Sequence, residues 1–278
     1  MTQRTIVLTG GTSGVGLGAA RTLATEHTRI ISLCRDETRG RAAAEGLAGT
    51  VDVVLCDLSS QASVRRAAAE ILETCPRIDA LLSCAGVAPW KRRTTAEGVE
   101  LVWATNFLGA FLLEHLLEDR LIESAPARIV MISGDAHRAG KIHWDDIELT
   151  QGYSAMEAAT QSVLAKIMWT YQLARRLEGT GVTANAFCPA FVRSGITRDF
   201  PWYMRPMIAL SHLFAQSPEQ GARTPVWLLE APEVEGLTGK YFREKAELRS
   251  SEASHDIEAQ ERVVELAAEM TGVELVAR

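Results

Sequence analysis

The sequence predicts an α/β fold in which one doubly wound parallel sheet of about seven strands lies between two layers of helices, a three-layer α/β/α arrangement. Short apolar runs alternate with amphipathic segments along the chain. Runs such as RIVMI and VTANAF are almost continuously apolar, as is typical of parallel strands that helices cover on both faces. Right-handed crossovers then place helices above and below the sheet. We expect one domain over residues 1–278, since α/β folds of this length often share a single core.

The elements can be followed in order from the hydrophobic pattern. The expected strands cover residues 4–9, 29–34, 51–56, 79–83, 128–133, 182–188 and 239–242. The segments between them carry apolar residues three and four positions apart, with charged residues on the other side. The expected helices cover residues 17–26, 39–48, 63–73, 98–117 and 162–178, and a last helix near 254–271 closes the fold. Residues 195–217 break the alternation with two prolines and many aromatic residues, and we expect them to form a lid over the substrate.

Composition excludes several classes of function. The chain has 29 Lys and Arg against 35 Asp and Glu, a net charge of −6, and no basic run, so nucleic acid is not an expected partner. No apolar segment approaches the length of a membrane helix, and the first apolar run ends too early for a signal peptide. We therefore expect a cytoplasmic protein. Its five cysteines are expected to be small buried hydrophobes, and we expect no metal site.

A glycine-rich loop follows the first strand directly. It reads TGGTSGVG at residues 9–16 and leads into a helix. Gly10 allows a tight turn, Gly14 lets the backbone approach a pyrophosphate, and Gly16 permits close helix packing. The start of the helix then faces the anion. Glycines alone are a weak signal, but strand, loop and helix agree here, so we predict a dinucleotide site.

The spacing Thr-Gly-x-x-x-Gly-x-Gly resembles that of the short-chain dehydrogenase/reductase family. Further motifs extend the resemblance along nearly the whole chain: CDLSS at 56–60, SCAG at 83–86, TNFLG at 105–109, CPAFVRS at 188–194, and SPEQGARTPVWLLEAPEVEGLTGKYF, which resembles the ending of retinol-dehydrogenase-like members. The resemblance implies a Rossmann-like fold. It also implies a set of residues around the nucleotide: Gly10, Thr12, Ser13, Gly14, Val15, Gly16, Arg35, Asp57, Leu58, Ala85, Gly86, Asn106, Pro189, Val192 and Ser194.

The second predicted strand ends in SLCRD, which bears on the choice of nucleotide. Cys34 stands where a site selective for NAD would place an acid, and Arg35 follows it. A guanidinium can pair with the 2′-phosphate of NADP(H), whereas a carboxylate would repel it. We therefore predict NADPH as the cofactor. The choice of nucleotide remains open, because Asp36 lies next to Arg35. The role of Arg35 also remains open, because an exposed arginine at a strand end needs no ligand.

The catalytic residues of the resembled family are missing. In that family a Ser polarises the carbonyl, a Tyr protonates it, and a Lys lowers the pKa of the Tyr and holds the ribose. RIVMISGDAH matches the family's Ser-Ser segment and puts Gly134 at the catalytic position. LARRLEGTGVT matches the end of the family's active-site helix without a gap, and counting back puts Ala159 at the Tyr position and Val163 at the Lys position. The resemblance thus implies that all three positions are substituted.

No other residue is an obvious replacement. Tyr153 has Glu157 four residues on and lies about a turn and a half before Ala159. Tyr171 lies roughly 18 Å of helix beyond the Ala159 level. Lys166 is on nearly the same face as Val163 and could reach a ribose, although an exposed or packing role is favoured. Without the Lys, Asn106 cannot support the family's usual water relay.

The sequence leaves two functions open. The first is an NADPH-dependent ketoreductase whose aromatic ketone is polarised by its own neighbouring hydroxyl, similar to the atypical ketoreductases of angucyclinone antibiotics in this family. Its substrate would meet aromatic side chains, although each could equally be a packing residue: Trp90, Trp144, Phe191, Phe200, Trp202 and Tyr203. The alternative is a catalytically inactive NADP(H)-binding sensor or scaffold. The oligomeric state stays open, because Trp169 and Trp227 could pack internally or at a dimer face.

Overall fold

The computed structural model describes residues 3–193, 195–211 and 213–275, and its strands form one eight-stranded sheet. The strands are β1 (Arg4–Thr9), β2 (Thr28–Cys34), β3 (Thr50–Leu55), β4 (Ala80–Ser83), β5 (Ala127–Ile132), β6 (Val182–Cys188), β7 (Tyr241–Arg243) and β8 (Ala246–Leu248). Their spatial order is β3-β2-β1-β4-β5-β6-β7-β8, and all neighbours are parallel except β7 and β8. The predicted parallel α/β sheet is confirmed.

The strand β8 is the one that the sequence did not predict. It pairs antiparallel with β7, joined by a tight turn in which Glu244 and Lys245 both have positive φ, 51° and 65°. Its three residues are mostly exposed and show no apolar run. Hydrophobic periodicity therefore carries no signal for it.

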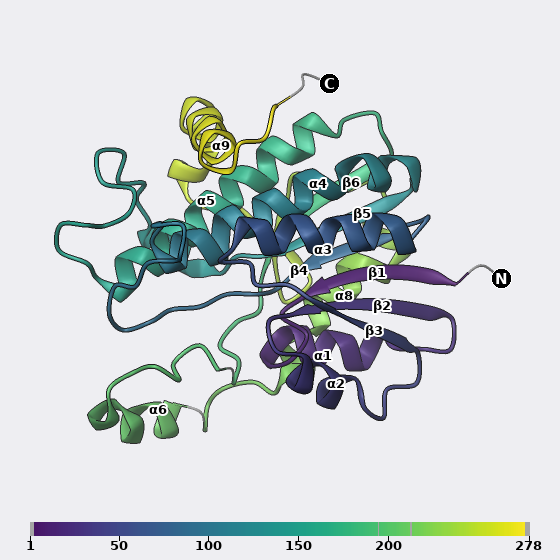
Figure 1. Cartoon of the computed structure of the whole chain (residues 1–278), viewed down its shortest axis with the longest axis horizontal. Coiled ribbons are helices and arrows are strands. Elements are labelled where there is room, and N and C mark those ends of the chain that lie inside the picture. Colours follow the sequence, from purple (N-terminus) through teal and green to yellow (C-terminus); the bar gives the residue numbers. More distant parts are fainter. Residues whose placement is uncertain (1–2, 194, 212, 276–278) are drawn as a thin grey trace.

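Helices cover both faces of the sheet (Figure 1). One face carries α3 (Gln61–Thr74), α4 (Gly109–Glu123), α5 (Ala155–Arg176) and α9 (Ile257–Thr271). The other face carries α1 (Gly14–Leu23), α2 (Glu37–Ala44) and α8 (Arg223–Glu230). None of the helices in the described ranges is both long and apolar enough to cross a membrane.

The two hydrophobic cores lie on opposite sides of the sheet. In β1, Val7 joins the core under α3, α4 and α5, whereas Ile6 and Leu8 join the core under α1 and α8. Successive side chains of a strand point to opposite faces, so a strand buried on both sides must be apolar throughout. This explains the continuous apolar runs of the sequence.

The predicted helix at 98–117 divides into two parts. Residues Trp103–Leu108 form the π-helix η1, and α4 continues from Gly109. The close approach of Gly109 to the loop after β3 leaves no room for a side chain, because a Cβ there would collide with the carbonyl oxygen of Leu58. Single π-helical turns are frequent at functional sites, and this one carries Asn106.

The order of the strands creates a crevice at one edge of the sheet. The chain runs outward from β1 through β2 to β3, and then crosses over to β4 on the other side of β1. The chain after β1 leads to α1 on one face of the sheet and the chain after β4 leads to α4 on the other face. Open α/β sheets bind ligands at such a point, beyond the carboxyl ends of the strands. The glycine-rich loop lies here.

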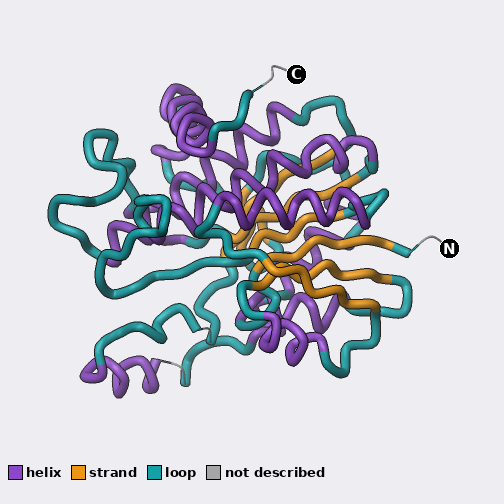
Figure 2. Tube along the Cα trace, viewed as in Figure 1, coloured by secondary structure: helices purple, strands orange, loops and turns teal. Residues whose placement is uncertain are grey.

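The expected lid segment extends away from the sheet. It contains the short helices η3 (Trp202–Met204) and α6 (Arg205–Ser211), and no residue of either is buried. Two backbone hydrogen bonds close its neck, from Arg193 N to Gln216 O at 3.1 Å and from Gln216 N to Phe191 O at 2.8 Å. Figure 2 shows this segment as a long loop carrying one helix apart from the body of the sheet.

Candidate functional site

The glycine-rich loop is shaped by close backbone contacts. Gly10 has φ +77°, and a Cβ there would lie 2.9 Å from Ala85 N. A Cβ on Gly16 would collide with the carbonyl oxygen of Gly10, so Gly16 lets the loop fold onto the first turn of α1. The close helix packing predicted for Gly16 occurs instead at Gly18, where a Cβ would meet the carbonyl of Pro218 in α7 (Pro218–Gly221).

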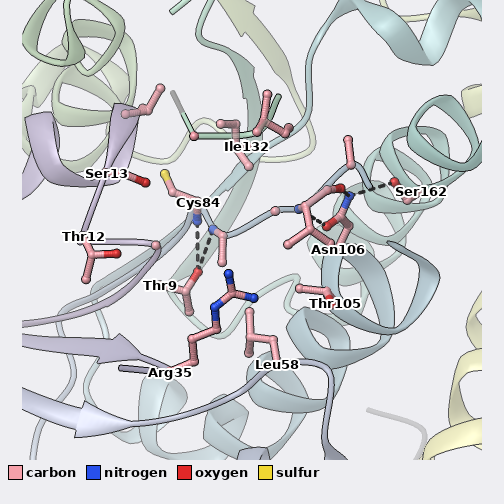
Figure 3. A pocket seen from close by; sticks show the side chains of 18 of the residues that line it. Thr9, Thr12, Ser13, Arg35, Leu58, Cys84, Thr105, Asn106, Ile132 and Ser162 are labelled. Atoms are coloured by element: carbon pink, nitrogen blue, oxygen red, sulfur yellow. Dashed lines mark hydrogen bonds between the residues drawn. The ribbon is translucent and has the colours of Figure 1, made fainter. Parts of the chain in front are cut away.

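The first turn of α1 faces this loop, and the N-cap side chain accepts no hydrogen bond from its backbone N–H groups. Gly14 begins the helix with φ +54°, and the Ser13 side chain at the N-cap makes no capping hydrogen bond. Helix N-termini leave four N–H groups without helical partners and carry positive partial charge. In Figure 3 the hydroxyls of Thr12 and Ser13 stand at the same side of the pocket. The arrangement fits a diphosphate.

The loop after β4 is held against the glycine-rich loop. Thr9 Oγ1 accepts hydrogen bonds from Cys84 N at 3.1 Å and Ala85 N at 3.2 Å, drawn as dashed lines in Figure 3. This contact joins the carboxyl ends of β1 and β4. It brings Ala85 and Gly86 to the pocket wall, as the sequence predicted for nucleotide-binding residues.

Asn106 fixes the next part of the wall. Its Oδ1 accepts from Val87 N at 2.7 Å, and its Nδ2 donates to Val87 O at 3.0 Å and to Ser162 Oγ at 3.3 Å. Figure 3 shows this clamp between α5 and the β4 loop. Because these bonds engage both ends of the Asn106 amide, its role within the described residues is to hold the wall in place.

Arg35 and Asp36 have separate roles at the end of β2. The Arg35 guanidinium points into the pocket (Figure 3) and has no hydrogen bond or ion pair within the described residues. Asp36 caps α2 by accepting from Arg39 N at 3.0 Å, so its carboxylate is used locally. Arg39 also lines the pocket, which the sequence reading missed although Arg39 lies four positions after Arg35. Two guanidiniums here suit a phosphate better than a ribose hydroxyl pair.

The turn after β3 supplies Asp57 and Leu58. The Asp57 carboxylate accepts from Ser59 N at 2.9 Å and from Ser59 Oγ at 2.7 Å, which fixes the turn. Leu58 is 7% exposed and lines the pocket with Asp57. Both residues belong to the CDLSS motif, which the resemblance placed around the nucleotide.

These walls enclose a cavity of about 600 Å³. Most of the predicted nucleotide residues line it: Gly10, Thr12, Ser13, Val15, Arg35, Asp57, Leu58, Ala85, Gly86, Asn106, Pro189 and Val192. Gly14, with its positive φ angle, and Gly16 belong to the loop and do not line the cavity, and Ser194 lies outside the described residues. The glycine-rich loop, the N-terminus of α1 without a side-chain cap, and the two arginines Arg35 and Arg39 together fit a phosphorylated dinucleotide.

Comparison with known proteins decides the family. The family model described as short chain dehydrogenase matches residues 4–202. The chain belongs to the short-chain dehydrogenase family. Among curated relatives, human retinol dehydrogenase 14 is 37% identical over 263 residues, covering 87% of this chain and 78% of that protein. Mouse retinol dehydrogenase 12 is 36% identical and covers 98% of this chain and 87% of that protein.

Solved structures agree with this short-chain dehydrogenase fold. An uncharacterised protein from Mycobacterium paratuberculosis has a TM-score of 0.81 at 28% sequence identity, covering 99% of this chain and 96% of that chain. A variant of actinorhodin polyketide ketoreductase with NADPH has a TM-score of 0.69 at 23% identity, covering 88% of this chain and 97% of that chain. At this low identity, the likeness to the ketoreductase shows a shared fold alone.

The three positions where this short-chain dehydrogenase is expected to lack catalytic residues lie on two elements. Gly134 follows β5 with φ +124°, a conformation that a serine would adopt only with strain. Ala159 is half-buried on α5, and Val163, one turn further, lines the cavity. Ser133, beside Gly134, donates its hydroxyl to Val163 O at 3.3 Å. That these positions match the family's catalytic ones stays a prediction.

Neither tyrosine that the sequence offered as a replacement acid lines the cavity. Tyr153 donates its hydroxyl to Pro89 O at 3.0 Å, and burial raises the pKa of Tyr153 to about 12. Tyr171 is 7% exposed, and its hydroxyl shares a hydrogen bond with Ser250 at 2.6 Å. The described lining of the cavity contains no Tyr and no His.

Lys166 lines the cavity, although the sequence did not place it in the site. The sequence favoured an exposed or packing role, but Lys166 is 3% exposed and lines the cavity. Burial lowers the pKa of Lys166, and Glu114 partly offsets this effect. Burial raises the pKa of Glu114 to about 7. The signal that was missed is an acid in the apolar run GAFLLEHLL and a lysine on the apolar face of the next helix.

The predicted substrate residues divide into three groups. Phe191 lines the cavity. Trp90 and Phe200 do not line it, but their rings meet with centroids 5.2 Å apart, beside the cavity-lining ion pair of Arg93 and Asp199. The third group, Trp144, Trp202 and Tyr203, lies outside the lining.

The residues of the third group differ in their surroundings. Arg262 of α9 lies 4.2 Å above the ring centre of Trp144, which packs against the core, so a substrate contact for Trp144 is not supported. Trp202 and Tyr203 are 77% and 61% exposed on the lid segment. Their expected substrate contact stays a prediction.

Proposed function

We propose that this short-chain dehydrogenase is an NADPH-dependent ketoreductase that reduces a ketone of an angucyclinone-type aromatic polyketide in antibiotic biosynthesis, with the substrate supplying the proton. The observation that carries the proposal is the wall of the cavity. It combines a phosphate cradle and two arginines with a described lining that has no Tyr or His. The names of the curated relatives, retinol dehydrogenases, support chemistry between an alcohol and a carbonyl group.

The substrate end of the cavity is apolar. Val87, Leu101, Phe191 and Ile196 line it, and the Trp90–Phe200 ring pair and the Arg93–Asp199 ion pair stand at its edge. Apolar and aromatic walls suit a flat polycyclic ligand, because they gain contact area at little entropic cost. A ring system with few charged groups is therefore the favoured substrate class.

The missing acid restricts the substrate further. Bound NADPH supplies a hydride. Losing a positioned general acid costs on the order of 10² to 10⁴ in rate, unless the substrate brings its own donor. A hydroxyl on the neighbouring ring can hydrogen-bond to the ketone oxygen and polarise it. When the hydride adds to the carbonyl carbon, the carbonyl oxygen takes this hydroxyl proton, and the resulting phenolate regains a proton from water.

The residues of the chain then act mainly by orientation. The clamp of Asn106 and the Ser133 contact to α5 hold the walls that place the ketone over the nucleotide. Positioning of two reactants can contribute several kcal/mol, on the order of 7 to 11 in favourable cases. A rigid cavity can therefore replace part of the lost acid catalysis.

Turnover of defined ketones tests the proposal. We expect the purified protein to oxidise NADPH in the presence of at least one aromatic ketone with a neighbouring hydroxyl, followed by the absorbance of the reduced nicotinamide. Retinaldehyde, which carries no such hydroxyl, is the matched negative substrate. Tight NADPH binding without turnover of any ketone would contradict the proposal and favour an inactive NADP(H)-binding sensor or scaffold.

A further inference from the structure

A second hollow lies outside the nucleotide cavity, between the start of α1 and the lid segment, and we call it the lid groove. Its volume is about 720 Å³. Thr12, Ser13 and Leu17 line it on the side of the sheet, and Phe200 and Ile208 line it on the side of the lid segment. In Figure 1, α6 of the lid segment lies on the same side of the molecule as α1 and α2. The lid segment thus forms a candidate site of its own beside the cavity.

Positive charge is concentrated in the lid groove. Arg39 comes from α2, Arg193 and Arg198 come from the chain after β6, and Arg205 comes from α6. The described lining of the lid groove contains no Asp and no Glu. None of these guanidinium groups makes a hydrogen bond or an ion pair within the described residues. Since the whole chain has a net charge of −6, the cluster does not follow from a basic composition.

The four arginines of the lid groove repel one another, because they carry the same charge and face one hollow. Water satisfies a single exposed arginine, but a cleft lined by one sign of charge has an electrostatic potential that attracts ligands of the opposite charge. Guanidinium groups bind carboxylate and phosphate oxygens through paired hydrogen bonds. The lid groove is therefore suited to an anionic oxygen group.

The phosphates of the cofactor have partners in the cavity itself. The 2′-phosphate would meet Arg35 and Arg39, and the diphosphate would meet the glycine-rich loop. Arg193 and Arg205, in contrast, line the lid groove and do not line the cavity. A nucleotide that fills the cavity thus leaves these two arginines without a partner. The lid groove remains open for the other ligand, the ketone substrate.

Arg198 joins the lid groove to the cavity. It lines both hollows, and so does Gly195. A Cβ on Gly195 would lie 2.8 Å from Arg198 Nη2, so this guanidinium lies against the backbone where the two hollows meet. Ile196, the next residue, lines the apolar substrate end of the cavity. A substituent of a ligand bound at this end would lead past Gly195 into the lid groove.

We propose that the lid groove binds an anionic oxygen group of the substrate, of which a carboxylate is the simplest case, and that Arg193, Arg198 and Arg205 recognise it. The inference rests on the proposed function, because it needs an aromatic ligand at the apolar end of the cavity. It narrows the substrate class to polycyclic ketones that carry an acidic side chain. The ring system then occupies the cavity, and the charge of the side chain lies in the lid groove.

Binding of a fluorescent probe tests the proposal without turnover. 1-Pyrenebutyrate has a flat ring system and a carboxylate on a short flexible chain, and its methyl ester is the neutral match. Neither compound is a ketone, so both can be titrated into protein saturated with NADP⁺. We expect the acid to bind roughly tenfold or more tightly than the ester, because charge-assisted hydrogen bonds form with the carboxylate. Equal affinities of the acid and the ester would overturn the proposal.

Variants of the lid arginines assign the preference for the acid to the lid groove. Arg193→Gln combined with Arg205→Gln should remove most of this preference, while the affinity for the ester stays within about twofold of the wild type. Arg223→Gln is the matched control and should keep the full preference, since Arg223 is exposed on α8 and lines neither hollow. A full preference for the acid in the double variant would contradict the proposal.

Two other occupants of the lid groove give different results with the same variants. If the wild type binds the acid and the ester equally and the double variant binds NADP⁺ roughly tenfold more weakly, the arginines hold the cofactor's phosphates and the proposal fails. The proposal also fails if inorganic phosphate binds to the NADP⁺-saturated wild type, but not to the double variant, and the acid is again not preferred. The lid groove would then hold a free anion.

The outcomes separate this inference from the proposed function. If the wild type reduces a hydroxylated ketone but shows no preference for the acidic probe, the inference fails and the proposed function stands. If the lid arginines give a preference for the acid but no ketone is reduced, the lid groove binds an acidic aromatic ligand and the proposed function fails instead.

Discussion

Methylation of the substrate's neighbouring hydroxyl should slow hydride transfer by a factor on the order of 10² to 10⁴, the usual contribution of a positioned proton donor. The reason is that the described lining of the cavity offers no Tyr or His to take over. Single-turnover reduction of a hydroxylated ketone and of its methyl ether, each with NADPH bound beforehand, measures the effect.

Binding of the methyl ether must be measured beside the rate, because the extra methyl group could exclude the substrate. Saturating concentrations separate the two effects, since a lost proton donor lowers the rate at saturation. Equal saturated rates for the hydroxyl compound and its ether would show that the proton comes from elsewhere.

Arg35→Ser should remove most of the preference for NADPH. We expect NADPH binding to weaken by roughly tenfold to a hundredfold and NADH binding to change little, because a charge-assisted contact to the 2′-phosphate is lost. Isothermal titration of both nucleotides measures this selectivity. The expected loss is large because Arg35 has no partner within the described residues that would otherwise hold it.

Arg41→Ser is the control for Arg35→Ser. Arg41 also belongs to the β2–α2 region, but it pairs with Glu37 on the surface and does not line the cavity. Its loss should leave both affinities unchanged. An unchanged NADPH preference in Arg35→Ser would assign the phosphate to Arg39 alone or contradict the choice of NADPH.

The sequence predicted the fold well where physical constraints are local. Strands buried on both faces must be apolar, which made β1, β5 and β6 visible as continuous runs. The strand β8 escaped because three exposed residues after a turn have no such constraint. The π-helical turn of η1 escaped because the apolar spacing of residues 98–117 does not distinguish it from the α-helix that follows.

The site was predictable where the chain itself sets the geometry. The glycine-rich loop is a local structure, and Gly10 has a positive φ angle, which suits the tight turn predicted there. Aromatic content alone does not distinguish a pocket residue from one that packs against the core beneath a surface arginine, as Trp144 does with Arg262. Lys166 was undervalued because its burial, and its closeness to Glu114 of another helix, are set by the tertiary structure.

Restoring the missing acid tests the central claim most directly, because the rest of the cavity stays in place. The variant Ala159→Tyr with Val163→Lys returns a Tyr and a Lys to adjacent turns of α5, and single-turnover hydride transfer to the hydroxylated ketone is the measurement. If the substrate supplies its own proton, the rate should change by less than about tenfold, while the methyl ether should gain. A gain on the hydroxylated ketone on the order of 10² to 10⁴ would contradict the account, because it would show that the protein's missing acid was limiting.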